Sequence, residues 1–254
     1  NDYTQRAFEE AQQALCPSVM CHHLDGRVEA NRVDAWAAAN IFCSLSDNIQ
    51  ETFGIAPLEA MATGLPVVVS DWNGYRDTVT EDVGFRVPTS APPPGLGGDL
   101  IHRYAQGTDN YDFYTGHASS FVAVDISAAA EAFCALIEDS TLRHRMGSAG
   151  KVRAKTAYDW SSVIPQYEQL WRELSDIRRK AETHPAAIWP ARMDPFAAFA
   201  HYATRQVAPA DIVKLTDKSA DYEQIMKLEM VKYAHRVTPS LEVVADILGK
   251  VDQT

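Results

Sequence analysis

Short apolar runs alternate with amphipathic stretches along the first third of the chain. Four of these runs predict β-strands, at residues 19–21, 41–43, 67–69 and 84–87. The stretch between the first two, residues 31–39, has apolar residues at helical spacing and predicts a helix. Strands that alternate with helices build a parallel sheet, so this pattern predicts an α/β fold.

One segment of the pattern, residues 51–79, combines predicted elements with candidate chemistry: ETFGIAPLEAMATGLPVVVSDWNGYRDTV. It predicts a loop, a helix with Pro57 at its first position, the buried strand at 67–69, a second loop and a second helix. Backbone N–H groups at 53–55 precede the first helix and have no intrahelical partners. They can therefore bind an anion or a sugar hydroxyl.

Two carboxylates, Glu51 and Glu59, flank this loop and helix start. Because Pro57 disfavours one continuous helix through both, we expect Glu51 in the loop and Glu59 in the first turns of the helix. A carboxylate accepts one hydrogen bond from each hydroxyl of a vicinal diol, and the helix start suits a phosphate. A nucleotide-sugar offers a diol, phosphates and a second polyol, although carboxylates at this spacing are also common on solvated helices.

Residues 88–119 break the pattern, since they are rich in Pro, Gly and polar aromatics and are too long for an ordinary connection. Such a stretch is either a functional lid or a disordered insert. Its aromatic residues favour an ordered insert: Tyr104, Tyr111, Phe113 and Tyr114. Because the insert follows the carboxyl end of a strand, it can lie over a ligand cleft. His102, Tyr104 and His117 are then acceptor-side contacts; the alternative is that they are solvated loop residues.

The remaining pattern is mostly helical. Residues 121–124 predict a strand, and helices are expected at about 127–138, 141–156 and 161–180. In the last of these, four residues form an apolar stripe that we expect to pack in the core: Ile164, Tyr167, Trp171 and Leu174.

Prolines at 185, 190 and 195 predict a linker, followed by about three helices, the last ending at Gly249. The chain is thus divided into a Rossmann-like lobe at 1–180, with an insert at 88–119, and a linker with a helical extension at 181–254. The helical extension is expected to serve packing or oligomerisation.

Composition narrows the function. The chain has 254 residues, of which 46% are hydrophobic and 22% charged, as in an ordinary soluble protein. A net charge of −11 argues against a nucleic-acid partner, whose phosphates need a basic face. No apolar run reaches membrane-spanning length, and a cytoplasmic location is expected. The four cysteines lack paired metal spacing, and Cys43 and Cys134 are expected to be reduced core thiols.

The segment ETFGIAPLEAMATGLPVVVSD resembles the signature of the retaining, nucleotide-sugar-dependent glycosyltransferases of family 4, which have the GT-B fold. The resemblance extends from about residue 17 to 87 and, more loosely, from 121 to 174. It implies the C-terminal, donor-binding lobe of a two-lobed enzyme, with the acceptor lobe absent from this chain. We expect this part alone to bind the donor without turnover.

The resemblance also implies roles for particular residues. Glu51 would contact the hydroxyls of the donor sugar at the reacting face and is the candidate catalytic residue. Glu59 would bind the two ribose hydroxyls of the nucleotide. The remaining donor-binding positions are the backbone at Phe53, Gly54 and Ile55 and the second helix start at Asn73 and Gly74. The family holds the diphosphate without a metal, and this chain contains no Asp-x-Asp, so no metal and no cofactor are expected.

The implied activity is hexosyl-type transfer from a nucleotide-diphosphate sugar to a saccharide, lipid or protein, with retention of configuration. The basic residues that neutralise the diphosphate in the family precede the segment that opens here. Arg27 and Arg32 are the nearest, and neither is assigned that role. Asp77 stands where the family usually has Glu.

Two alternatives and two kinds of partner stay open. The chain could be a non-catalytic nucleotide-sugar-binding or assembly module, or another GT-B enzyme such as a sugar-nucleotide epimerase or a phosphorylase-like protein. Intact Glu51 and Glu59 argue against a degenerate module. Membrane attachment through the missing lobe and oligomerisation through the C-terminal helices remain expectations about partners.

Overall fold

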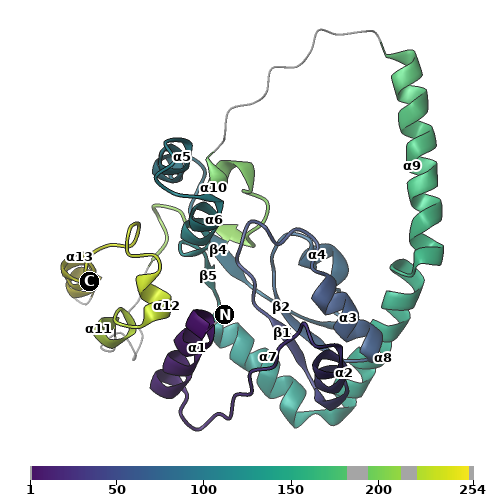
Figure 1. Ribbon diagram of the computed structural model, residues 1–254, viewed down its shortest axis with the longest axis horizontal. Helices are drawn as coiled ribbons and strands as arrows, with labels where there is room; N and C mark the ends of the chain where they lie inside the picture. Colours follow the sequence, from purple (N-terminus) through teal and green to yellow (C-terminus); the bar gives the residue numbers. More distant parts are fainter. Residues whose placement is uncertain (1, 182–193, 213–221, 252–254) are drawn as a thin grey trace.

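The computed structural model describes residues 2–181, 194–212 and 222–251, and Figure 1 shows their arrangement. The larger part is a sheet of three parallel strands: β1 (Phe42–Ser44), β2 (Val67–Ser70) and β3 (Gly84–Val87), in the order β1-β2-β3. All four residues of the central strand β2 are buried. The predicted parallel α/β fold class is therefore confirmed, as are the strands at 41–43, 67–69 and 84–87.

Helices cover both faces of this sheet. The side chains of β2 alternate between the two faces, so each face presents apolar residues that a helix can bury. Val67 and Val69 pack with Met61 of α3 (Ile55–Thr63) and with Tyr75 of α4 (Tyr75–Thr78). Val68 points to the other face and packs with Leu136 of α7 (Ile126–Glu138). The remaining helices of this part are α2 (Glu29–Ala38) and α8 (Ser140–Ala157). An apolar run without alternation is thus the sequence of a strand buried on both faces.

The predicted strand at 19–21 is wrong. Residues 16–28 connect α1 (Asp2–Leu15) to α2 through turns and irregular chain, and Val19 and Met20 are exposed. A strand needs a neighbouring strand for its main-chain hydrogen bonds, and β1 is the edge of the described sheet. An apolar tripeptide alone does not specify one.

A second, smaller sheet has its central strand at the start of the predicted insert. It has the order β5-β4-β6, formed by β4 (Thr89–Ala91), β5 (Ala123–Val124) and β6 (Arg205–Gln206). Between β4 and β5 the chain forms α5 (Gly98–Ala105) and α6 (Tyr111–Ser119). The aromatic residues of the insert contact one another here, and Tyr104 stacks on Tyr114 at 5.1 Å between ring centroids. Their core includes Phe196 of α10 (Pro195–Ala198) and reaches Trp72 of the larger part.

The long helix α9 (Trp160–Lys180) differs from expectation. Its apolar stripe was predicted to pack in the core, but the helix has no buried residue, and Ile164, Tyr167, Trp171 and Leu174 are all exposed. Figure 1 shows the reason: α9 leaves the end of α8 and extends beyond the sheet. The start of α9 borders α3 and the end of α8, but these neighbours leave every described residue of the helix at least partly exposed.

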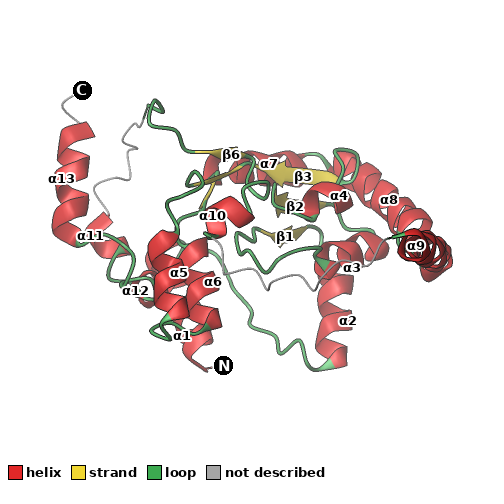
Figure 2. Ribbon diagram, turned by 90° about the horizontal axis from the view of Figure 1, so that it is seen from above, coloured by secondary structure: helices red, strands yellow, loops and turns green. Residues whose placement is uncertain are grey.

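The C-terminal part consists of short helices at the end of the molecule opposite α9, as Figures 1 and 2 both show. They are α11 (Tyr222–Ile225), α12 (Glu229–Lys232) and α13 (Leu241–Val251), so the last helix passes the predicted end at Gly249. α12 lies beside α1, where the Glu229 N–H donates to Oε2 of Glu10 (3.3 Å). Pro185 and Pro190 of the predicted linker lie outside the described residues.

Two further observations concern composition. All four cysteines are free, but Cys43 and Cys134 are exposed, so their assignment to the core is wrong. Cys43 lies on the edge strand, and Cys134 lies off the buried face of α7 formed by Ala129, Ala132 and Leu136.

Within the described ranges, no helix combines the length and the apolar character needed to cross a bilayer.

Candidate functional site

The two predicted donor-binding segments meet in space because of the sheet topology. The loop with Glu51 follows β1 and the loop with Asn73 follows β2, and the carboxyl ends of neighbouring parallel strands lie at the same edge of a sheet. The Asn73 amide donates to the carbonyl oxygens of Glu51 (3.1 Å) and Thr52 (3.3 Å). A Cβ on Gly74 would lie 2.2 Å from the Thr52 oxygen, so only glycine allows this approach.

Glu51 lies in the loop, as predicted, and its carboxylate has a fixed partner. The Tyr75 hydroxyl donates to Glu51 Oε2 at 3.2 Å and lies 2.9 Å from Oγ of Ser44, at the end of β1. Burial raises the pKa of Tyr75 to about 12, so the phenol stays protonated and remains a donor at neutral pH.

Glycine at position 54 allows the loop to pass over this tyrosine. Gly54 has φ +75° and caps α3, and a Cβ there would lie 2.1 Å from Cε1 of Tyr75. The helix begins at Ile55, two residues before the predicted start, and Pro57 takes the third helical position. A proline is tolerated there because the first N–H groups of a helix have no intrahelical acceptor. No side chain caps this helix start.

Glu59 projects from α3 into a cleft of about 590 Å³ between α3, the end of α8 and the start of α9. Phe53 and Ile55 line the same cleft, and the Phe53 ring meets the edge of Tyr158 at 6.0 Å. Glu51 is not among the residues that line it. The sequence predicted one pocket flanked by both carboxylates, whereas this cleft is lined by Glu59 alone of the two.

Two lysines in this cleft were missed by sequence reasoning. Lys151 and Lys155 of α8 line it together with Glu59. Lys155 pairs with Asp159 at 2.7 Å, whereas no ion pair found in the described part of the chain involves Lys151. The available signal was their spacing of four residues, which places both on one face of the helix that ends before Tyr158.

The two histidines of the insert, His102 and His117, lie in different environments. His117 is fully buried, with Nδ1 3.2 Å from Oδ2 of Asp109, so its assignment as an acceptor contact is wrong. Burial lowers the pKa of His117, against the opposing effect of Asp109, and the imidazole is neutral at pH 7. His102 lines a different pocket, and the Tyr104 ring packs against those of Tyr111 and Tyr114.

Arg27 and Arg32, the basic residues singled out at the start of the chain, do not line the cleft of Glu59. Arg27 pairs with Asp25 at 2.8 Å on the surface, and Arg32 donates to the Gly26 carbonyl oxygen. In the described part of the chain, no group of three or more His, Cys, Asp or Glu side chains is arranged to hold a metal ion.

Parts of this chain are similar in sequence to known proteins. Residues 5–92 match the sequence profile of the family described as glycosyl transferases group 1. The chain is 29% identical over 156 residues to the phosphatidyl-myo-inositol mannosyltransferase of Mycobacterium leprae, covering 61% of this chain and 32% of that protein. It is 27% identical over 183 residues to the D-inositol 3-phosphate glycosyltransferase of Corynebacterium urealyticum, covering 71% and 35%.

Among solved structures, sucrose-phosphate synthase of Thermosynechococcus elongatus aligns with 68% of this chain and 35% of its own, at 25% identity and a TM-score of 0.44. The chain spans about a third of the length of the curated relatives that it matches. The resemblance of residues 51–71 to a glycosyltransferase signature lies inside the region matched by the family profile. The part of the chain that is similar to the glycosyl transferases group 1 family, residues 5–92, thus contains both loops of the candidate site.

Proposed function

We propose that this chain binds a nucleotide-diphosphate sugar and that, in the complete enzyme, the hexosyl group passes to an acceptor with retention of configuration. The observation that carries the proposal is the contact between two loops at the ends of β1 and β2. This contact brings Glu51 and the N-terminus of α3 next to the turn at Asn73 and Gly74. Ligands of open parallel sheets bind at this edge.

The nucleotide part would occupy the cleft of Glu59. Its carboxylate accepts one hydrogen bond from each ribose hydroxyl, a pairing that suits a vicinal diol. Lys151 lines the same cleft, with no carboxylate partner in the described residues, and supplies positive charge for the diphosphate. The N–H groups at the start of α3 add donors at the same side.

The donor sugar would contact Glu51. Tyr75 binds Oε2 of this carboxylate, which leaves Oε1 to accept hydrogen bonds from sugar hydroxyls. Because the phenol of Tyr75 keeps its proton, the carboxylate is held in one orientation rather than repelled. Glu51 is thus the residue that we place closest to the reacting carbon.

In the proposed reaction the bond between the anomeric carbon and the diphosphate oxygen breaks. The acceptor hydroxyl oxygen bonds to that carbon on the same face, and its proton goes to the leaving diphosphate. Donors and positive charge around the leaving group stabilise the charge that develops there. Two relatives are named for phosphatidyl-myo-inositol and D-inositol 3-phosphate, so a polyol hydroxyl is our preferred acceptor.

Titration calorimetry with UDP, GDP and ADP tests the binding step. One of them should bind this chain, and Glu59→Ala should weaken that binding by roughly 1–3 kcal/mol, the range for a charged hydrogen-bonded group. Glu131→Ala removes an exposed carboxylate on α7 and should change nothing. Equal affinity in wild type and Glu59→Ala would refute the ribose assignment. Nucleotide binding without sugar transfer by the complete protein would favour the non-catalytic module.

A further inference from the structure

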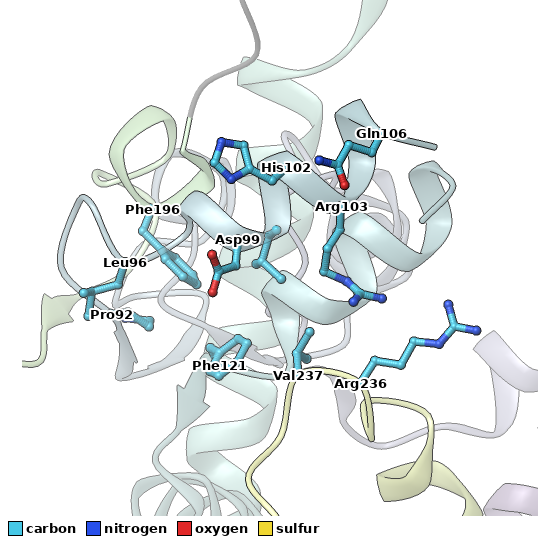
Figure 3. Close-up of a pocket in the computed structure, with 11 residues that line it drawn as sticks. Pro92, Leu96, Asp99, His102, Arg103, Gln106, Phe121, Phe196, Arg236 and Val237 are labelled. Atoms are coloured by element: carbon cyan, nitrogen blue, oxygen red, sulfur yellow. The ribbon is translucent and has the colours of Figure 1, made fainter. Parts of the chain in front are cut away.

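A second pocket lies on the predicted insert, and it shares no lining residue with the cleft of Glu59. Its volume is about 510 Å³, within the range of small-molecule sites. Figure 3 shows that α5 forms one wall, while Phe121, Phe196 and residues 236–237 close the others.

One side of this pocket is apolar. Phe121 and Phe196 meet edge to face at 6.3 Å between ring centroids. Phe196 is 7% exposed and forms part of the core, whereas Phe121 is 37% exposed beside the hollow. Leu96 and Leu100 of the same wall add aliphatic surface. Exposed apolar side chains inside a hollow gain free energy when an apolar group covers them.

The other side is basic. Arg103 donates two hydrogen bonds to Asp109, at 2.7 and 2.8 Å, and Arg236 reaches the same carboxylate with one longer bond of 3.3 Å. Asp109 is 1% exposed, and the third group around it, His117, is neutral because burial lowers its pKa. Two guanidinium groups therefore share one carboxylate, which leaves one positive charge on this side of the pocket, away from the carboxylate of Asp99.

Of the two arginines, Arg236 has more N–H donors left for a ligand. A guanidinium has five N–H donors in a planar fork, and the one bond to Asp109 leaves the others for an anion. Its side chain is also 43% exposed, so a ligand can reach it. Figure 3 shows Arg103 and Arg236 on one side of the pocket and the two phenylalanines on the other.

We propose that this pocket binds a small, soluble anionic amphiphile: a carboxylate or phosphate monoester head on an aliphatic or aromatic body. The head lies at Arg236 and Arg103, and the body lies against Phe121 and Phe196. Asp99 lines the pocket on the side of Phe196 and repels a head group placed there, which fixes the direction of binding. This site does not depend on the proposed transferase function.

Calorimetric titration with three probes tests the two halves of the assignment. Octyl phosphate should bind, whereas inorganic phosphate lacks the body and octyl glucoside lacks the charge, so each should bind about tenfold more weakly or worse. Equal affinity for octyl glucoside overturns the anion assignment, and equal affinity for inorganic phosphate overturns the apolar one. Binding to phosphatidic acid vesicles without binding to monomeric octyl phosphate overturns the proposal of a soluble ligand.

Variants locate the site. Arg236→Gln and Phe121→Ala should each weaken octyl phosphate binding by about tenfold, and Asp99→Asn, a change at an exposed residue, should strengthen it. Arg179→Gln and Trp171→Gln on α9 are matched controls with no expected effect. Affinity that falls with Trp171 but not with Phe121 places the ligand on α9 and overturns the proposal, as does unchanged affinity in Asp99→Asn and Arg236→Gln together. Nucleoside diphosphate affinity should stay the same in all five variants.

Discussion

Tyr75, the first residue of α4, donates a hydrogen bond to Glu51 in the loop after β1, with 3.2 Å between the phenol oxygen and Oε2. The tyrosine is 1% exposed and also contacts Ser44 at the end of β1. The candidate catalytic carboxylate is therefore positioned from the core of the sheet rather than by its own flexible loop.

Replacing Tyr75 with phenylalanine removes this bond but keeps the ring in place. We expect the free energy of unfolding to fall by about 0.5–1.5 kcal/mol, the usual net value of one hydrogen bond. In the complete enzyme turnover should fall as well, because Glu51 is no longer held. Denaturant unfolding and a transfer assay measure the two effects. Tyr111→Phe, on the exposed face of α6, is the matched control, and equal behaviour of the two variants would contradict the prediction.

Replacing Gly54 with alanine should destabilise the contact between its loop and Tyr75. The left-handed φ of +75° strains any other residue, and the new Cβ would lie 2.1 Å from the Tyr75 ring. Together these effects should cost about 1–3 kcal/mol of unfolding free energy. Gly26→Ala, which meets no atom within 4 Å, is the comparison, measured by the same denaturant titration. A Gly54→Ala protein as stable as Gly26→Ala would show that the loop adapts.

Glu51→Ala should separate chemistry from binding. Glu51 does not line the cleft of Glu59, so nucleoside diphosphate affinity should change little. Turnover of the complete enzyme should fall much more, because the carboxylate is assigned to the donor sugar. Calorimetry measures the nucleoside diphosphate affinity, and a single-turnover assay measures the rate of transfer. A loss of affinity as large as the loss of turnover would move Glu51 into the nucleotide site.

Acid should weaken the contacts between the insert and the C-terminal segment. His117 is surrounded by Arg103, Arg236, Asp109 and the ring of Tyr233, and burial lowers its pKa. The unfolded chain therefore takes up a proton at higher pH than the folded one, so stability falls as pH drops below about 6.5, the ordinary histidine value. Unfolding free energy should be smaller at pH 5.5 than at pH 7.5. His117→Gln should reduce that difference, and an unchanged difference would assign it to other groups.

Sequence patterns predicted the central sheet well because its strands are specified locally. The run at 67–69 is apolar on both faces and is bounded by Gly64 and Pro66, and such a run has few other stable environments. The loops at its carboxyl edge could be placed by topology alone. The tripeptide at 19–21 is bounded by Pro17 and by the turn dipeptide Asp25-Gly26, but it has no neighbouring strand to pair with in the described part of the chain.

Features formed by distant residues could not be predicted in this way. Asp109 meets Arg236 across 127 residues, and the hydrogen bond between Tyr75 and Glu51 joins α4 to the loop after β1. The periodicity of α9 correctly predicted a helix but not its surroundings, because an apolar stripe indicates that a helix has a face to bury and not what covers it. The place of Lys151 in the site could not be predicted for a similar reason, because three helices form its cleft.

The exposed stripe of α9 has a thermodynamic consequence. Complete burial of a fully exposed large apolar side chain stabilises by roughly 1.5–3 kcal/mol; because the seven exposed apolar residues of α9 are about half exposed, covering four of them would contribute roughly 3–6 kcal/mol before entropy costs. That reaches the lower end of the net stability of a whole domain. Any association through α9 should therefore carry a large negative change in heat capacity, which makes temperature-dependent calorimetry the most sensitive detector of this face.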